Sequence, residues 1–349
     1  MKKLLNKLKK KTQKQVPPSR ITNETVAEHR EHILAGGRKF KYPVQYARHK
    51  LVINTILVSI ASIALILLLC WWQLYPAQNT SGFMYRLTQI VPVPVATIDG
   101  QQVRYSDYLM RFRSSMHFLQ QQNMINVNSA DGKRQIDHIK RQSLDEAISV
   151  SFAEKVAKQK NITIGNDQID AFIKTERESQ QSPLSEQAYE SVVLKGFYDW
   201  SLDEYKNIVK STLMRREVSF AVDDTARQKI NGLEARLKRG EDFAKLAKEF
   251  SDDSTKVSGG DVGFVARSSQ DQSGLVKAAA SLRPKQNSGI IKGMDGYYIV
   301  RLLEADGKKI RYARIKVALT EFTKQLTEQK QKSLQEYISV PRENTNVTS

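Results

Sequence analysis

Residues 239–264 read RGEDFAKLAKEFSDDSTKVSGGDVGF, and this stretch decides the fold of the C-terminal half of the chain. Its apolar residues at 243, 246, 247 and 250 recur at the spacing of one helix face. The glycines that follow, Gly259, Gly260 and Gly263, predict a tight turn. The stretch therefore predicts a short helix that leads into a glycine-rich turn.

The elements on either side of this stretch complete one α+β domain. A strand is expected over Val218–Val222, followed by a helix that ends at Gly240. After the turn we expect a small helix around Leu275–Leu282 and a buried strand over Gly296–Leu303. The resulting order β-α-α-turn-α-β, over residues 218–305, is typical of a compact α+β domain.

The rest of the chain is predicted to be mainly helical. Several segments between residues 95 and 217 have one apolar helix face, which predicts a helical lobe. Ser201 and Glu204 match a capping box that opens one of these helices. A strand over Ile310–Leu319 and a helix from Glu321 to about Ile338 are expected after the α+β domain. They cannot bury their own apolar face, so both should dock back on that lobe. We expect a basic tail at 1–50, a transmembrane helix at 51–75, a linker at 76–94, the helical lobe at 95–217, the inserted α+β domain at 218–305, the returning strand and helix at 306–340, and a disordered tail at 341–349.

The positive charge of the chain is concentrated before an apolar segment. The formal net charge is +18, and residues 1–50 supply +11 of it through 14 basic and 3 acidic residues. Residues 51–72 carry no charge and are long enough to cross a bilayer, with Trp71, Trp72 and Tyr75 at the far interface. Because basic flanks stay inside, the N-terminus is predicted to be cytoplasmic and the domains extracytoplasmic. A cleaved signal peptide is the competing interpretation, but the long basic region favours an uncleaved anchor.

Composition argues against several other functions. Membrane topology explains the basic excess, so we expect no nucleic-acid partner. All five histidines precede residue 140, so the C-terminal domain has no nucleophile–histidine pair and we expect no metal site there. His29 and His32 have charged neighbours, and a solvated helix face explains them better than a metal site. The single cysteine, Cys70, lies in the apolar segment, which leaves the exported part without an intrachain disulfide.

The stretch at 239–264 closely resembles the parvulin-type peptidyl-prolyl isomerases, as does GYYIV at 296–300. The segments VATIDG at 95–100, LDEAI at 144–148 and ITI at 162–164 look like the helical chaperone lobe of extracytoplasmic foldases of the PrsA and SurA type. The resemblance implies catalysis of X-Pro isomerisation in unfolded exported polypeptides, without a cofactor. That reaction is slow when uncatalysed, because its barrier is about 18–20 kcal/mol.

The resemblance also implies site residues. It places the acidic position of the family's site at Asp253 and an apolar substrate-binding position at Leu275. The two family histidines fall on Phe220 in the first strand and Tyr298 in the last, and the Tyr298 hydroxyl can donate a comparable hydrogen bond. We therefore expect Asp253 and Tyr298 to be catalytic and Phe220 and Leu275 to bind substrate. The expected structural turn consists of Gly259, Gly260, Asp261 and Gly263.

Two functions stay open from the sequence. The first is a membrane-anchored extracytoplasmic foldase that binds unfolded exported proteins and catalyses X-Pro isomerisation. The alternative is a non-catalytic chaperone or peptide-binding scaffold with a degenerate parvulin domain, because both histidines are replaced. In that case Asp253 is a solvated turn carboxylate and Tyr298 a core aromatic. Unfolded client polypeptides, and membrane lipid through residues 51–75, are the expected partners in both cases.

Overall fold

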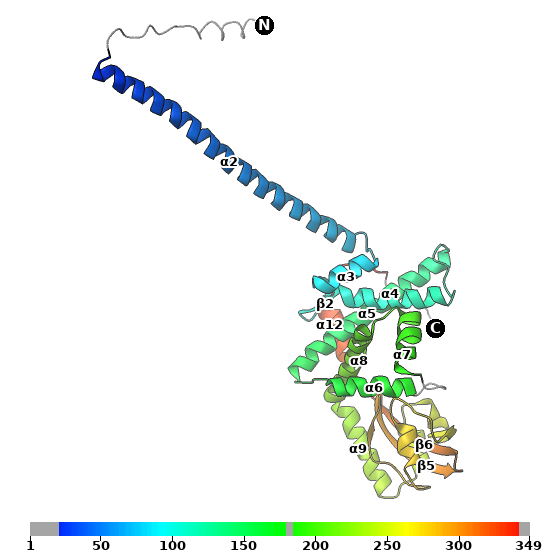
Figure 1. The fold of residues 1–349 in the computed structure, drawn as a ribbon. Helices are drawn as coiled ribbons and strands as arrows, with labels where there is room; N and C mark the ends of the chain where they lie inside the picture. Colours follow the sequence, from blue (N-terminus) through cyan, green and yellow to red (C-terminus); the bar gives the residue numbers. More distant parts are fainter. Residues whose placement is uncertain (1–20, 179–183, 342–349) are drawn as a thin grey trace. The chain divides into compact units, whose positions relative to one another are not determined.

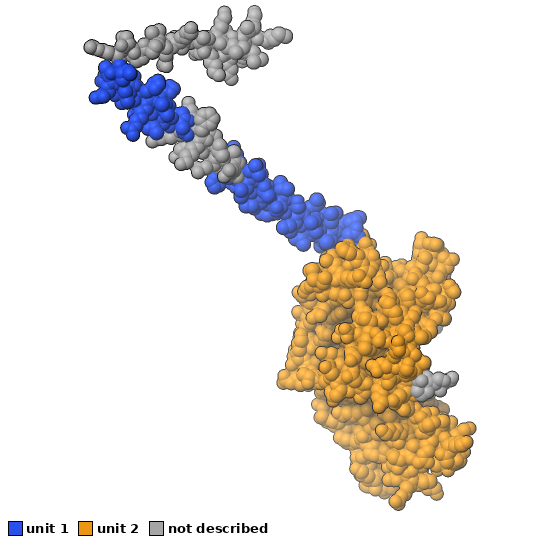
Figure 2. Space-filling model, viewed as in Figure 1, with its two compact units in different colours: residues 1–73 blue, residues 74–349 orange. Residues whose placement is uncertain are grey.

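The computed structural model describes residues 21–178 and 184–341, without the side chains of residues 38–48. The chain divides into two compact units, residues 1–73 and residues 74–349 (Figure 2). Residues 1–20 of the expected basic tail, and residues 342–349 of the expected disordered tail, lie outside the described residues.

The first unit is described as one long helix, α2, which spans Asn23–Leu74 and ends in the first residue of the second unit. Thr22 and Thr25 stabilise the start of the helix, because the Oγ1 atom of each accepts a hydrogen bond from the other residue's backbone N–H. Residues 23–50 are therefore helical, and His29 and His32 are exposed on this helix. Its segment His49–Leu74 has 26 residues, a mean hydropathy of 2.7 and an apolar surface outside any protein core, which fits one membrane crossing by length and composition.

The second unit begins with a mainly helical lobe (Figure 1). Its core is built around fully buried side chains such as Tyr105, Leu109, Leu144 and Ile148. The expected linker at 76–94 contains a helix, because Ser81 caps its start by accepting from the Met84 N–H at 3.4 Å. The elements of the lobe are α3 (Gly82–Ile90), β1 (Pro94–Ile98), β2 (Gln101–Arg104), α4 (Tyr105–Gln121), α5 (Ala130–Gln159), α6 (Asn166–Glu178), α7 (Glu186–Ala188), the π-helix η1 (Tyr189–Phe197) and α8 (Leu202–Val222).

The C-terminal helix and a short strand return to this lobe. Helix α12 spans Glu321–Ser333, and its Phe322 ring packs 5.7 Å from the ring of Phe152. Strand β7, Gln335–Glu336, pairs antiparallel with β1. Arg141 holds this strand through Glu336 at 3.0 Å. The helix predicted over 321–338 thus docks on the lobe but ends earlier than expected.

The remaining elements form the α+β domain (Figure 1). Its four-stranded antiparallel sheet has the order β3-β6-β5-β4. Alternation along β5 sends Tyr297 and Ile299 into the core under α9 and α10, and Tyr298 and Val300 into the core under α11. The elements are α9 (Asp224–Lys238), α10 (Phe243–Phe250), the 3₁₀ helix η2 (Ser254–Ser258), β3 (Asp261–Ala266), α11 (Leu275–Ala280), β4 (Ile291–Lys292), β5 (Gly296–Ala305) and β6 (Lys309–Ala318).

Two expectations about this domain are wrong. Residues Val218–Val222 are the end of α8 and not a strand. Their alternating burial arises because Val218 packs into the lobe core while Phe220 packs into the α+β core, on the other side of the helix. The strand near 310–319 does exist as β6, but it pairs with β3 and β5 inside the sheet instead of docking on the lobe. A tight turn at Gly307, with φ +83°, returns the chain from β5 into β6.

A single buried carboxylate joins the two places where the chain passes between lobe and α+β domain. Asp223 follows α8, is 2% exposed and caps α9 by accepting from the Ala226 N–H at 2.8 Å. Its other oxygen accepts from the N–H groups of Thr320 and Glu321, at 2.7 and 3.1 Å, where the chain enters α12. Burial alone would raise the pKa of Asp223, but these three donors outweigh burial and hold the pKa below the ordinary 3.8.

We expect Asp223→Asn to lower the free energy of unfolding by about 2 kcal/mol, because the amide NH₂ must face a backbone donor. Since the folded-state pKa lies below the unfolded one, the stabilising contribution of Asp223 is complete above about pH 5 and is lost as the pH falls through the folded-state pKa. The measurement is urea unfolding of wild type and variant between pH 3 and pH 7. Asp224→Asn, at an exposed neighbour paired with Arg227, is the control. If the free energy of unfolding of Asp223→Asn fell with pH as steeply as that of wild type, this role of Asp223 would be contradicted.

Candidate functional site

The glycine-rich turn positions the candidate site by bringing η2 against β6. Gly259 ends η2 with φ +68°, and a Cβ there would lie 2.8 Å from the Ala244 Cβ. Gly260 has φ +84°, and a Cβ there would lie 2.3 Å from the Arg314 carbonyl oxygen. The Gly260 carbonyl accepts from the Arg314 N–H at 2.9 Å. Two adjacent glycines are thus required by backbone conformation and by close packing.

Asp261 and Gly263 complete the turn. The Asp261 carboxylate accepts from the Gly263 N–H at 2.8 Å and pairs with Arg311 of β6 at 2.6 Å. The hydrogen bonds from Arg311 are the main cause that lowers the pKa of Asp261. Gly263 has φ +84° next to a register shift in the β3–β6 pairing. These interactions stabilise the turn and occupy both carboxylate oxygens of Asp261, which indicates a structural role.

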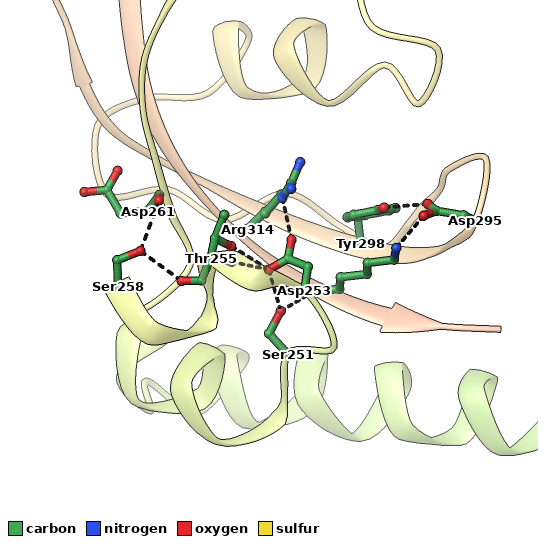
Figure 3. A network of polar contacts seen from close by, with 9 residues as sticks. Ser251, Asp253, Thr255, Ser258, Asp261, Asp295, Tyr298 and Arg314 are labelled. Carbon is green, nitrogen blue, oxygen red and sulfur yellow. Dashed lines mark hydrogen bonds and ion pairs between the residues drawn. The ribbon is translucent and has the colours of Figure 1, made fainter. Parts of the chain in front are cut away.

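Asp253 lies at the centre of a polar network between η2 and β6 (Figure 3). Its side chain is 8% exposed, and one oxygen accepts from the Thr255 N–H at 3.0 Å and the Thr255 hydroxyl at 2.6 Å. The other oxygen accepts from Arg314 Nε at 2.6 Å. Burial would lower the pKa of Arg314, but the Asp253 carboxylate outweighs it and raises that pKa. Asp253 is therefore a buried partner of Arg314 and not a solvated turn residue.

Tyr298 belongs to a second polar pair on the same face of the sheet. Its hydroxyl donates to Asp295 at 2.6 Å (Figure 3). Lys316 of β6 pairs with the same carboxylate. Burial and the hydrogen bond to Asp295 both raise the pKa of Tyr298, so its phenol is neutral at any physiological pH. The residue as a whole is 5% exposed and packs in the core under α11. Tyr298 is thus a core aromatic with a hydrogen-bonded hydroxyl.

The structure brings three of the four predicted site residues to one face of the sheet and separates the fourth. Leu275, the first residue of α11, is 3% exposed and packs in the same cluster as Tyr298. Arg314, which pairs with Asp253, lies on β6 opposite Val300 of β5, and Val300 belongs to that cluster. Phe220 lies in the other core, with its ring 4.8 Å from that of Tyr297. Because residues 297 and 298 point to opposite sides of the strand, Phe220 does not share a site with Tyr298.

Sequence reasoning missed the basic residues of this face. Arg314 and Lys316 lie two residues apart on β6, and they pair with Asp253 and Asp295. The signal was present, because the alternation of Ile315 and Val317 with basic residues predicts that the basic side chains share one face. Because the sequence predicts that the strand after residue 305 docks on the helical lobe, it does not place Arg314 and Lys316 beside Asp253 and Asp295.

The chemistry of the face follows from these pairs. Every polar group described above is engaged within the protein, so neither Asp253 nor Tyr298 offers a free base or acid. No histidine occurs in residues 140–349. Among the described residues, no group of three or more histidine, cysteine, aspartate or glutamate side chains is arranged to hold a metal ion. What remains is a buried apolar cluster beside satisfied ion pairs.

A second candidate site lies in the helical lobe, where aromatic rings line two adjoining cavities. The Tyr198 ring stacks on Trp200 at 4.6 Å and on Phe118 at 5.8 Å. Cavities of about 430 and 750 Å³ both include Tyr198 and Trp200 in their walls. Arg113 and Glu204 border the smaller cavity, which mixes charge with aromatic surface. Stacked rings beside open cavities can bind apolar side chains of a polypeptide.

Comparison with known proteins identifies the family. A family model described as the SurA-like N-terminal domain matches residues 45–219, half of the chain. The chain belongs to this family. A second model, the PPIC-type PPIase domain, matches residues 214–304 of this SurA-like chain. The predicted resemblance to parvulin-type isomerases and to PrsA and SurA foldases is thereby confirmed. The PPIC-type match ends before β6, the strand that carries Arg314.

Curated relatives of this SurA-like chain bear foldase and chaperone names. The foldase protein PrsA of Caldanaerobacter subterraneus is 26% identical over 59% of this chain and 72% of the relative. PrsA of Bacillus subtilis is 34% identical over 32% of this chain and 36% of the relative. The chaperone SurA of Bordetella pertussis is 30% identical over 48% of this chain and 33% of the relative. The match thus spans about a third of the latter two proteins. The crystal structure of Bacillus subtilis PrsA, at 19% identity, gives a TM-score of 0.22 over 58% of this chain and 79% of that one.

Proposed function

We propose that this protein is an extracytoplasmic foldase of the PrsA and SurA type that binds unfolded exported polypeptides. The observation that carries the proposal is the union, in one chain, of a SurA-like lobe with aromatic cavities and a PPIC-type domain. The internally satisfied pairs Arg314–Asp253 and Tyr298–Asp295 favour binding over chemistry as the main activity. The names of the PrsA and SurA relatives support the same assignment.

The proposal includes a location and excludes one class of partner. Segment His49–Leu74 anchors the chain in the membrane as a single span, with the basic N-terminus in the cytoplasm and residues from Tyr75 onward outside. The fourteen basic residues before the span support this orientation. Because the charge excess belongs to that topology, nucleic acid is not a partner. Client polypeptides and membrane lipid are the proposed partners.

A substitution in the aromatic cavities tests where clients bind. Tyr198→Ala removes the ring that stacks on both Trp200 and Phe118, so we expect at least a tenfold weaker affinity for an unfolded polypeptide. The measurement is fluorescence anisotropy of a labelled, reduced and alkylated protein titrated with the full chain in nanodiscs. Val192→Ala, at a 54% exposed position on η1, is the matched control. Equal affinities for wild type and the Tyr198 variant would exclude this cleft as the client site.

X-Pro isomerisation is a second candidate function, favoured by one observation. Leu275 and Tyr298 pack in one apolar cluster on the face that also holds the Arg314–Asp253 pair. An apolar cluster beside fixed polar groups has the chemistry to hold a proline ring, and X-Pro isomerisation requires no covalent step. The test is the cis–trans exchange rate of an Ala-Pro peptide with the full chain, measured by NMR. If this face is catalytic, Leu275→Ala abolishes the acceleration, and the absence of any acceleration by wild type removes this candidate.

A further inference from the structure

Helix α3 exposes an apolar face that no element of the described chain covers. Ile90 is 81% exposed, Phe83 is 70% exposed and Val91, directly after the helix, is 48% exposed. Phe83, Arg86 and Ile90 lie three and four residues apart, so they share one side of the helix. The opposite side is buried through Met84 and Thr88, and α3 packs there beside α4 (Figure 1). Large apolar side chains gathered in this way indicate a contact with something outside the lobe.

The chain brings this face next to the end of the apolar span. Leu74 ends the segment His49–Leu74 and is itself 4% exposed in the lobe core, where its carbonyl accepts from the Tyr105 hydroxyl at 2.6 Å. The Tyr75 hydroxyl donates to the Pro94 carbonyl at 2.7 Å. Pro94 is only four residues after Ile90, which limits the separation of Ile90 and Pro94 to about 14 Å. The exposed end of α3 is therefore held close to the residue at which the apolar segment ends.

We infer that the face of α3 formed by Phe83, Arg86 and Ile90, with Val91, inserts into the interfacial layer of the outer leaflet and is a second membrane contact. This inference rests on the proposed anchoring through His49–Leu74. The bilayer is the proposed partner of this face, because the anchor keeps this apolar phase permanently within reach of these side chains. Arg86, exposed between them, has the chemistry to bind a lipid phosphate. Phe83 and Arg86 also border the 430 Å³ cavity, whereas Ile90 and Val91 do not, so Ile90 is the more selective reporter.

The test measures the depth of spin labels in the full chain, reconstituted in nanodiscs with a Cys70→Ser background. A nitroxide on Ile90→Cys is expected to collide more with oxygen than with a water-soluble nickel complex, a shift that marks the membrane interface. Val257→Cys is the control, because Val257 is also 81% exposed but lies on η2 of the α+β domain. This label is expected to behave as fully aqueous. An Ile90 label as aqueous as the Val257 label would overturn the inference.

Further labels separate this inference from the proposed anchoring. A label on Ile60→Cys, in the middle of the apolar segment, reports the span itself. If Ile60 is in the bilayer and Ile90 is in water, the anchoring stands and the second contact is wrong. If both are in water, the anchoring has failed. A short distance between Ile90 labels of two copies, measured by pulsed dipolar spectroscopy, would assign the face to a dimer and overturn the membrane contact. In nanodiscs with anionic lipids, a lower oxygen collision rate of the Ile90 label after Arg86→Glu would support the membrane contact.

Discussion

Arg314→Ala is expected to destabilise the α+β domain by about 3 kcal/mol, at the low end of the loss for a broken buried ion pair. The Asp253 side chain is 8% exposed, and without Arg314 its charge has no basic partner in this network. The loss is at the low end because Arg314 is 27% exposed and the Thr255 donors remain. The measurement is the urea dependence of hydrogen exchange in peptides from β3, β5 and β6.

Two further variants make this prediction specific. Arg311→Ala, on the same strand, breaks a more exposed pair with Asp261 and is expected to have a much smaller effect. Adding Asp253→Asn to Arg314→Ala removes the stranded charge and is expected to recover part of the loss. If Arg311→Ala were as damaging as Arg314→Ala, or if the double variant were no better than the single one, the Arg314–Asp253 pair would not organise this site.

Gly260→Ala is expected to be the most damaging single-methyl change in the domain. Its left-handed conformation costs a residue with a Cβ about 1–2 kcal/mol. The added methyl would also lie 2.3 Å from the Arg314 carbonyl oxygen, and displacing backbone in a packed core adds about 1–3 kcal/mol. Because the displaced strand carries Arg314, we also expect exchange of the β6 amides to increase.

Gly263→Ala separates the two causes. Gly263 has the same φ of +84°, but an added Cβ would meet no atom within 4 Å. The variant therefore shows the conformational loss alone, and urea unfolding should place it clearly between wild type and Gly260→Ala. Equal losses for the two variants would show that close packing against β6 contributes nothing.

Local signals in the sequence predicted the elements around the turn well. The Phe243–Phe250 helix, the glycine turn, the small helix at Leu275 and the strand from Gly296 all exist, because each is specified by its own spacing and its own breakers. The capping box at Ser201 and Glu204 also forms, with Ser201 Oγ accepting from the Glu204 N–H at 3.2 Å.

The errors have one physical origin: packing between distant parts of the chain determines the structure of these segments. Residues Val218–Val222 alternate because the end of α8 lies between two cores, a pattern that local spacing cannot distinguish from a strand. Strand β6 was located correctly, but its partners depend on a hairpin and a sheet that local spacing does not specify. The second error concealed the role of Arg314, because it placed β6 outside the sheet.

The central claim is that the chain acts on unfolded exported polypeptides chiefly by binding them. The most direct measurement is light scattering of a chemically denatured client diluted into nanodiscs that carry the full chain, beside empty nanodiscs. We predict that aggregation falls in proportion to the amount of chain, and that Leu275→Ala suppresses aggregation as well as wild type does. Scattering equal to that with empty nanodiscs would contradict the account.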